Sequence, residues 1–399
     1  MAERSPTLSI EERVRQLITA VEGGTRALIC THDNPDPDSI ASAFALGRLL
    51  EQKRGIPFTL TYGGVLGRAE NRAMVRLLKI PLVPISRIDL SEFDVVGLVD
   101  TQLDVGNHSL DPTRMEDKKV ICIDHHPARL LFKSAAYADV GGDYGATSSV
   151  LTAYCDAAGV VFDVALASAL FYGIKTDTRD LGRESNEADV WAYSHLVGLT
   201  DMALVSAIEH PRLPRSYFSV LVRAFQHAQV WGNVVACDLG ETYIPDIVAE
   251  TADRLVAAEG MRWAAVVGEY DGQIYASIRV NDRRFSAGKL VREVIQRYPE
   301  GSAGGHNSMA GARVPHGPKE KTAATRTRAR RKLMKDLVFA TGIAPDTQPE
   351  PFAREREAVA EAPVPVDKPK NGATKNGAPK NGAQKRSDAL PDEATPKPG

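Results

Sequence analysis

THDNPDPDSI, residues 31–40, is the stretch that decides how the first part of this sequence folds. It follows an apolar run at 27–30 that is typical of a buried strand, and it precedes a long segment with helical spacing of apolar residues. Two prolines stiffen the connection between the two elements. We therefore expect His32, Asp36 and Asp38 on a turn at the carboxyl end of a strand, which is where open parallel sheets bind their ligands.

Short apolar runs alternate with helical patterns through the first 190 residues. Strands are predicted at 26–32, 57–64, 94–100 and 118–126, and helices at 8–22, 38–55, 69–78, 146–159 and 164–177. In the 38–55 helix, Asp38 is the candidate N-cap and Gly55 the stop signal. This order predicts an α/β fold in which a mostly parallel sheet is covered by helices on both faces.

The rest of the chain divides into three further parts. Residues 191–230 have a helical pattern and are expected to connect a first domain (1–190) to a second. Residues 231–340 predict a smaller α/β domain, with a strand pair that turns at 270–272, a helix at 286–298, and a glycine-rich turn within 301–315 that leads into a last strand. Residues 341–399 repeat a Lys-Asn-Gly-Ala unit, and their composition predicts a disordered tail.

Composition and charge exclude several classes of protein. None of the four cysteines forms a CxxC pair, which excludes a zinc ribbon and argues against a disulfide scaffold. No apolar stretch reaches ~18 residues and the N-terminus lacks a signal-peptide core, so we expect no membrane partner and a cytoplasmic protein. The net charge of -2 gives no global attraction to nucleic acid. The basic run at 326–335 is interpreted as the solvated face of a terminal helix, with a nucleic-acid contact as the alternative.

Acids and histidines also end other predicted elements, namely Asp100, Asp124, His125, His126 and Asp177. Taken singly, an Asp after a strand is usually a turn former or a helix cap, and a lone His is usually a structural residue. Together at one sheet edge, however, these groups would concentrate negative charge. Carboxylates that lie so close repel each other unless cations neutralise them. The pattern therefore predicts a site for divalent metal.

The ligand types indicate which metal to expect. Imidazole and carboxylate without thiolate favour Mn²⁺, with Mg²⁺, Co²⁺ or Fe²⁺ as alternatives. Five or six ligands are too many for one ion that keeps a position open. We therefore expect two ions bridged by a carboxylate, an arrangement that clamps the attacking water and the leaving oxygen in phosphoryl transfer.

Several motifs occur in an order that resembles a known family. HDNPDPDS (32–39), VVGLVDTQ (95–102), IDHHP (123–127) and FYGIKTDTRD (171–180) resemble the DHH family of phosphoesterases. SIRV (277–280) and GGHNSMAGA (304–312) resemble the arginine strand and the glycine-glycine-histidine loop of the DHH-associated C-terminal domain. The resemblance covers roughly residues 10–318. Within this family, the sequence most resembles the bifunctional branch that combines nano-RNase (oligoribonuclease) and 3′-phosphoadenosine 5′-phosphate (pAp) phosphatase activity. The length of the two domains fits that branch.

The resemblance implies a centre with two manganese ions. It implies six ligands: His32 and Asp36 for one ion, Asp38 and His125 for the other, Asp100 as the bridge, and Asp177 to complete the site. Asp124 would orient His125, as carboxylates usually do for metal-bound imidazoles. His126 would contact the scissile phosphate or the leaving oxygen, and the roles of the two histidines are open to exchange.

The second domain would bind the remainder of the substrate. Arg279 would offer a guanidinium fork to a phosphate. Gly304 and Gly305 would let backbone amides approach an anion, and His306 would donate to it. Val280, where this branch often has a polar residue, and a loop with fewer glycines than the richest family versions leave the substrate open.

We therefore predict a manganese-dependent hydrolase acting on short RNA, on pAp, or on both. A phosphodiesterase for cyclic or linear dinucleotides would use the same site. A non-catalytic nucleotide-binding regulator is the alternative from another class, although such a protein would be expected to have lost a metal ligand. Assembly into a homodimer is left open.

Overall fold

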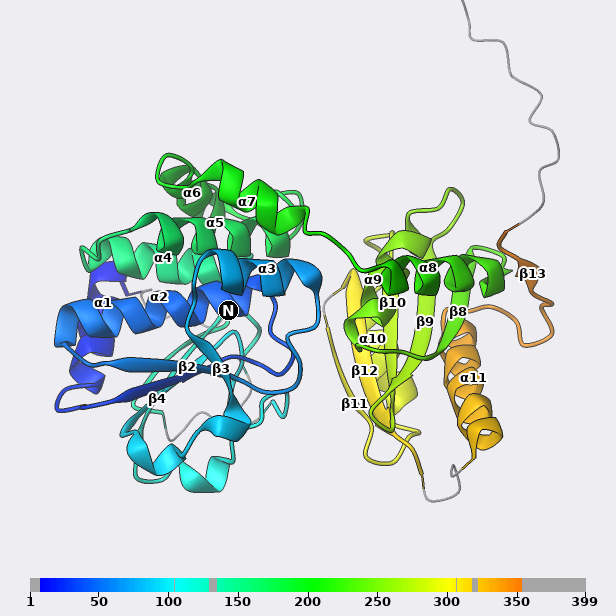
Figure 1. The fold of residues 1–399 in the computed structure, drawn as a ribbon, viewed down its shortest axis with the longest axis horizontal. Coiled ribbons are helices and arrows are strands. Elements are labelled where there is room, and N and C mark those ends of the chain that lie inside the picture. The colour runs from blue at the N-terminus through cyan, green and yellow to red at the C-terminus, as the bar shows by residue number, and fades with distance from the viewer. Residues whose placement is uncertain (1–7, 104, 129–134, 306, 318–321, 354–399) are drawn as a thin grey trace, which may run out of the picture. The chain divides into compact units, whose positions relative to one another are not determined.

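The computed structural model describes residues 8–103, 105–128, 135–305, 307–317 and 322–353. Its ribbon contains two sheets, each with its own helices, and we describe the two domains separately (Figure 1). Among the described residues, we find no helix that is both long and apolar enough to cross a membrane.

The parallel sheet predicted for the first domain is confirmed. Six strands form it, in the order β3-β2-β1-β4-β5-β6, and the outer two, β3 and β6, were not among the predicted strands. The strands are β1 (Ala27–Cys30), β2 (Phe58–Tyr62), β3 (Leu82–Pro84), β4 (Val95–Val99), β5 (Lys119–Asp124) and β6 (Tyr137–Val140). The chain leaves β1 toward β2 and β3, and then returns to place β4 on the other side of β1. The carboxyl ends of β1 and β4 therefore flank the point at which the strand order reverses, where such sheets bind ligands.

Helices cover one face of this sheet rather than both. The helices are α1 (Ile10–Ala20), α2 (Pro37–Arg54), α3 (Ala69–Leu77), α4 (Thr147–Ala157), α5 (Val164–Thr178), α6 (Glu187–Val197) and α7 (Met202–Glu209), and they share one core with Ile29 and Ile121 of the sheet. On the opposite face, Leu28 and Val96 pack against short 3-10 turns and the loops around them (η1, Ile85–Arg87; η2, Leu90–Glu92; η3, Pro112–Arg114). The prediction of helices on both faces was therefore wrong, because short apolar turns bury the second face.

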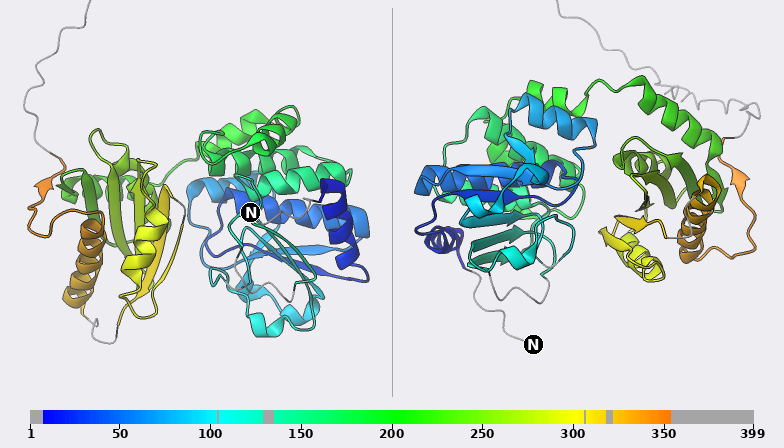
Figure 2. Two further views of the ribbon diagram at one scale, coloured as in Figure 1. Left: turned by 180° about the vertical axis from the view of Figure 1, so that it is seen from behind. Right: turned by 60° about the horizontal axis from the view of Figure 1, so that its bottom comes forward.

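The second domain is a mixed sheet in the order β11-β12-β10-β9-β8-β7-β13. Its strands are β7 (Gln229–Trp231), β8 (Val234–Glu241), β9 (Trp263–Tyr270), β10 (Gln273–Val280), β11 (Ser302–Gly305), β12 (Met309–Pro315) and β13 (Glu350–Pro351). Only the β8–β9 pair is parallel among these described strands. Helices α10 (Ala287–Ile295) and α11 (Ala323–Ala340) cover one face, and α8 (Arg215–His227) and α9 (Asp246–Val256) cover the other (Figure 2).

Two segments differ from the predicted division of the chain. The segment predicted as a helical connector contains α7, which joins the first core through Val205, and α8, which joins the second core through Tyr217. The predicted disordered tail begins too early at 341, because β13 pairs with β7 and the ring of Phe352 lies 6.4 Å from that of Phe225. The rest of the predicted tail, 354–399, lies outside the described residues.

Candidate metal centre

The turn after β1 positions the first acids by capping two helices. Asp36, rather than the predicted Asp38, is the N-cap of α2, because its Oδ1 accepts the amide of Ser39 at 3.0 Å while Ser39 Oγ accepts the Asp36 amide at 3.1 Å. This reciprocal arrangement is a capping box. The side chain of Asp38, in the first turn of α2, is then directed to a different helix.

Asp38 binds the start of α4. Its two carboxylate oxygens accept the backbone amides of Thr147 at 2.8 Å and Ser148 at 2.7 Å. The N-cap of α4 is Ala146, which makes no side-chain cap, so Asp38 satisfies amides that the helix itself leaves open. Gly173 lets α5 approach this junction, since a Cβ at that position would lie 2.4 Å from Ser148 Oγ and 3.2 Å from Asp38 Cα.

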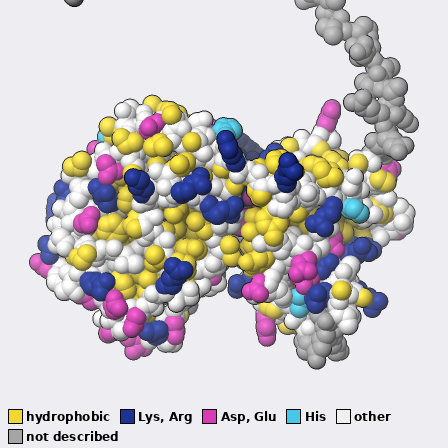
Figure 3. All heavy atoms as spheres, viewed as in Figure 1, with side chains coloured by type: hydrophobic (Ala, Val, Ile, Leu, Met, Phe, Trp, Pro, Cys, Tyr) yellow, Lys and Arg dark blue, Asp and Glu magenta, His cyan; other side chains and the backbone are white. Residues whose placement is uncertain are grey.

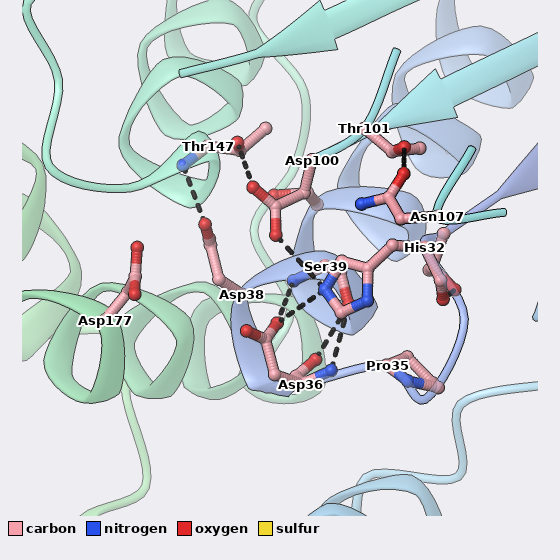
Figure 4. A network of polar contacts seen from close by, with 12 residues as sticks. His32, Pro35, Asp36, Asp38, Ser39, Asp100, Thr101, Asn107, Thr147 and Asp177 are labelled. Carbon is pink, nitrogen blue, oxygen red and sulfur yellow. Dashed lines mark hydrogen bonds and ion pairs between the residues drawn. The ribbon is translucent and has the colours of Figure 1, made fainter. Parts of the chain in front are cut away.

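Asp100 directly follows β4 and has a left-handed backbone. Its φ is 56°, a conformation that Asp tolerates better than most residues, and its amide donates to the carbonyl of Ile123 at 3.0 Å. Thr147 Oγ1 donates to Asp100 Oδ1 at 3.0 Å. The side chain is only 4% exposed. Figure 4 shows this carboxylate turned toward His32 and Thr147.

Six predicted ligands form two separate groups, in each of which the ligand atoms lie within 4.8 Å of one another. These groups are His32, Asp36 and Asp100, and Asp38, His125 and Asp177. In the first, the Nε2 atom of the histidine lies 3.6 Å from the Asp36 carboxylate and 3.5 Å from that of Asp100. In the second, His125 Nε2 lies 3.4 Å from Asp177 Oδ2. A third group, Asp100 with His125 and His126, joins the first two.

Asp124 contacts His126 and not the histidine that we expected. Its Oδ1 lies 2.7 Å from His126 Nδ1 and accepts the His126 amide at 3.0 Å, whereas the Nδ1 of His125 lies 3.1 Å from the carbonyl of Tyr144. The expectation that Asp124 orients His125 is therefore corrected. Gln102, to which the sequence analysis gave no role, donates to Asp124 Oδ2 at 2.7 Å from a buried position.

The electrostatics of the centre fit bound cations. Burial, together with the charges of Asp100 and Asp177, raises the pKa of Asp38 well above its usual range. Burial likewise raises the pKa of Asp177 to about 6, against the opposing effect of His125. Burial also opposes ionisation of Asp100, but His126 and His32 outweigh it and hold its pKa well below the usual range. Carboxylates this crowded need positive charge, and the mixed nitrogen and oxygen donors suit a pair of divalent ions.

One basic residue of the first domain also joins the centre. Arg183 Nη2 donates to Asp177 Oδ1 at 3.1 Å, and its side chain is 13% exposed. From its place close to the motif at 171–180, Arg183 is expected to steer phosphate but not to contact a ligand residue. It follows a series of left-handed residues at 179–181, and spacing along the sequence gives no indication that the chain turns back there.

The described second-domain residues that were predicted to bind substrate are already engaged in an ion pair or in a strand. Arg279 is buried, and its guanidinium forms a two-point ion pair with Asp253, with Nε at 2.5 Å from one oxygen and Nη2 at 3.3 Å from the other. Gly304 and Gly305 lie on edge strand β11 rather than in the predicted turn. Gly305 has φ 140° and a Cβ there would lie 2.4 Å from Ala310 Cα. His306 lies outside the described residues.

Comparison with known protein families finds two matches in this chain. Residues 26–174 match the N-terminal domain of the DHH family, and residues 231–335 match the DHHA1 domain. An exopolyphosphatase-related protein from Bacteroides fragilis has the same fold at 14% identity, with a TM-score of 0.65 over 85% of this chain and all of that one.

A sequence relative is an uncharacterized protein, MJ1633, of Methanocaldococcus jannaschii. The two are 34% identical over 318 residues, which are 78% of this chain and 62% of the relative. The chain therefore spans less than two thirds of that relative's length.

Proposed function

Because this chain belongs to the DHH family, whose members are phosphoesterases, we propose that it is a two-metal phosphoesterase that hydrolyses short oligoribonucleotides, pAp, or both. One observation carries the proposal. The six candidate ligands divide into two groups of three with no residue in common, and Asp100 and His125 also belong to the group that joins them. This is the arrangement expected for two neighbouring ions rather than one.

The chain's own residues hold this centre in place. Thr147 fixes the Asp100 carboxylate, and the start of α4 fixes that of Asp38. Divalent ions at these ligands would activate a water and neutralise charge on the phosphate. Asp124 holds the His126 ring through Nδ1, so we assign Nε2 of His126 to the phosphate or to the leaving oxygen.

We assign Mn²⁺ to the site, with Mg²⁺ or Co²⁺ as alternatives, because nitrogen and oxygen donors are mixed and none of the six ligands is a cysteine. In the second domain, we assign the rest of the nucleotide to Gly304, Gly305 and His306. Arg279 would contribute only if a phosphate replaces Asp253 as the partner of its guanidinium.

The test is hydrolysis by the purified chain, with added Mn²⁺, of a ladder of labelled RNA lengths, pAp and a cyclic dinucleotide. We expect turnover of the shortest RNAs and of pAp, and its loss in EDTA. Turnover of the cyclic or linear dinucleotide alone would instead assign the chain to signalling phosphodiesterases. If none is hydrolysed although Mn²⁺ binds, the enzyme proposal fails and a nucleotide-binding regulator becomes the better description.

A further inference from the structure

Helix α11 presents a basic face that the proposed catalytic centre does not use. Its inward face is buried against the sheet through Leu333, Met334, Leu337 and Val338. The outward face carries four exposed cations, at Arg328, Arg331, Lys332 and Lys335. Positions 328, 331 and 335 are three and four residues apart, so they lie in one row that extends over ~10 Å of the helix.

Little of this charge is neutralised. Within the described part of the chain, Arg328 and Lys335 have no ion pair. Arg331 is 3.9 Å from Asp238, but that carboxylate already accepts Arg330 at 2.9 Å. Lys332 alone has a close acidic partner, Asp336, at 2.7 Å.

The neighbouring helix extends the same surface. Helices α10 and α11 pack on one face of the sheet, and Lys289 and Arg292 of α10 and Arg297 just after it are exposed. Tyr298 links the two, because its Oη donates to Asp336 at 2.6 Å and Lys332 Nζ lies 4.8 Å from the centre of its ring. We call this set of seven cations with Tyr298 the α10–α11 basic surface. In Figure 3, which has the view of Figure 1, Lys and Arg side chains lie near α11 together with Asp and Glu side chains.

This surface is separate from the predicted substrate arginine. Along β10, Ile278 and Val280 point into the core beneath α10 and α11, whereas the alternate residue Arg279 points to Asp253 of α9. The α10–α11 basic surface and Arg279 therefore lie on opposite faces of the second sheet.

We propose that the α10–α11 basic surface binds the phosphate backbone of single-stranded RNA. Guanidinium groups suit phosphate oxygens, and Tyr298 adds an aromatic ring among the cations. A lipid surface fits less well, because the apolar side chains of α11 are buried and leave no apolar face to enter a membrane interface. The surface would hold an RNA strand whose end is hydrolysed, a use that rests on the proposed function, although binding itself does not.

The test measures binding of a labelled uridine homopolymer to the full chain in EDTA over a range of salt concentrations. The variant Arg328→Gln/Arg331→Gln/Lys335→Gln removes the row, and Arg76→Gln/Arg87→Gln/Arg114→Gln removes three exposed arginines of the first domain as a matched control. We expect the first variant to weaken binding at least tenfold and to lower the slope of log affinity against log salt by about 2, at ~0.7 for each lost phosphate contact. The control should bind like the wild type. Both should hydrolyse dinucleotides normally, and equal unfolding temperatures would show that each remains folded.

Equal affinity of the wild type and the α11 variant, or equal losses in both variants, would overturn the proposal. So would failure of the wild type to bind RNA, including the case in which it binds vesicles of phosphatidylcholine and phosphatidylglycerol instead. The two proposals fail separately. RNA binding that depends on α11, without hydrolysis of any substrate, would refute the enzyme and retain this surface. Hydrolysis without RNA binding at α11 would refute this surface and retain the enzyme proposal.

Discussion

Replacing Asp100 by Asn tests the proposed centre most directly. The amide keeps the size of the side chain, and Asn, like Asp, tolerates the left-handed φ of 56° at this position. The substitution therefore removes one negative charge with little added backbone strain. Asp100 belongs to one of the two ligand groups and to the group that joins them, so the ion held with His32 and Asp36 should lose a ligand, and the second ion should lose one too if Asp100 is the bridge.

The substitution should strongly lower the affinity for Mn²⁺ and kcat/KM, but it should change the stability of the metal-free protein little. A metal ion supplies several kcal/mol of charge stabilisation in such reactions, and losing ~4 kcal/mol lowers kcat/KM by ~10³-fold. At Mn²⁺ a hundredfold above its Kd, binding should add ~2.7 kcal/mol to the free energy of unfolding of the wild type. A hundredfold loss of affinity would reduce this gain to ~0.4 kcal/mol. In EDTA the variant loses the charge that faces His32 and His126 but also relieves the crowding of Asp38, so its free energy of unfolding should change by less than the gain that Mn²⁺ gives the wild type.

The assay combines Mn²⁺ content per chain, thermal unfolding with and without Mn²⁺, and kcat/KM on a dinucleotide. Asp111→Asn is the control, since Asp111 is an exposed cap of η3, where Asn also caps, and it lies outside the cluster. Activity of Asp100→Asn within tenfold of the wild type, with unchanged stabilisation by Mn²⁺, would refute the reasoning.

Three further substitutions, each with its reason in the structure, test contacts in the first and the second domain. Gly305→Ala should lower the free energy of unfolding by at least ~2 kcal/mol, because the added Cβ meets backbone at a positive φ, whereas Gly304→Ala, which meets nothing within 4 Å, should cost less than half of that in thermal unfolding. Arg330→Met should cost ~1.5–3 kcal/mol in urea unfolding, because it removes the close cation of Asp238 and one of the cations of the buried Glu269, which keeps Arg326 at 2.8 Å, while Arg331→Met on the exposed side should change stability little; equal costs would contradict this account. Gln102→Leu removes a buried donor from the DHH aspartate, so we expect a loss of ~1–3 kcal/mol in stability and a lower kcat with Mn²⁺ content retained, and an unchanged kcat would argue against a positioning role.

The strand ends were predictable from sequence because buried parallel strands are short and apolar, and polar residues mark where they stop. Residues that follow β1, β4 and β5 do lie together, since those strands are adjacent in the sheet. The N-cap of α2 was also readable. Proline is favoured at the first helical position, so Pro37 indicates Asp36 as the cap, and this signal was not used.

Other contacts carry no sequence signal. Asp124 precedes two adjacent histidines, and only the local backbone after β5 decides which ring turns back toward it. The sequence did not indicate that 3-10 turns and loops bury one face of the first-domain sheet. A 3-10 turn is too short to show a recognisable period of apolar residues. The ion pair of Arg279 depends on where α9 crosses β10, which periodicity within either element cannot give.

The acids of the centre serve the fold as well as the proposed chemistry. Asp36 caps α2, and Asp38 supplies to α4 the cap that Ala146 cannot make. Each contact offsets part of the repulsion that crowded carboxylates would otherwise impose, and each fixes a side chain before any ion binds. A centre built in this way is preorganised for metal. The entropic cost of ordering the Asp36 and Asp38 side chains is already borne when α2 and α4 fold. The same arrangement explains why removing Asp38 should affect both stability and metal affinity, whereas Asp100, which caps no helix and keeps a partner for Thr147 when replaced by Asn, reports mainly on the metal.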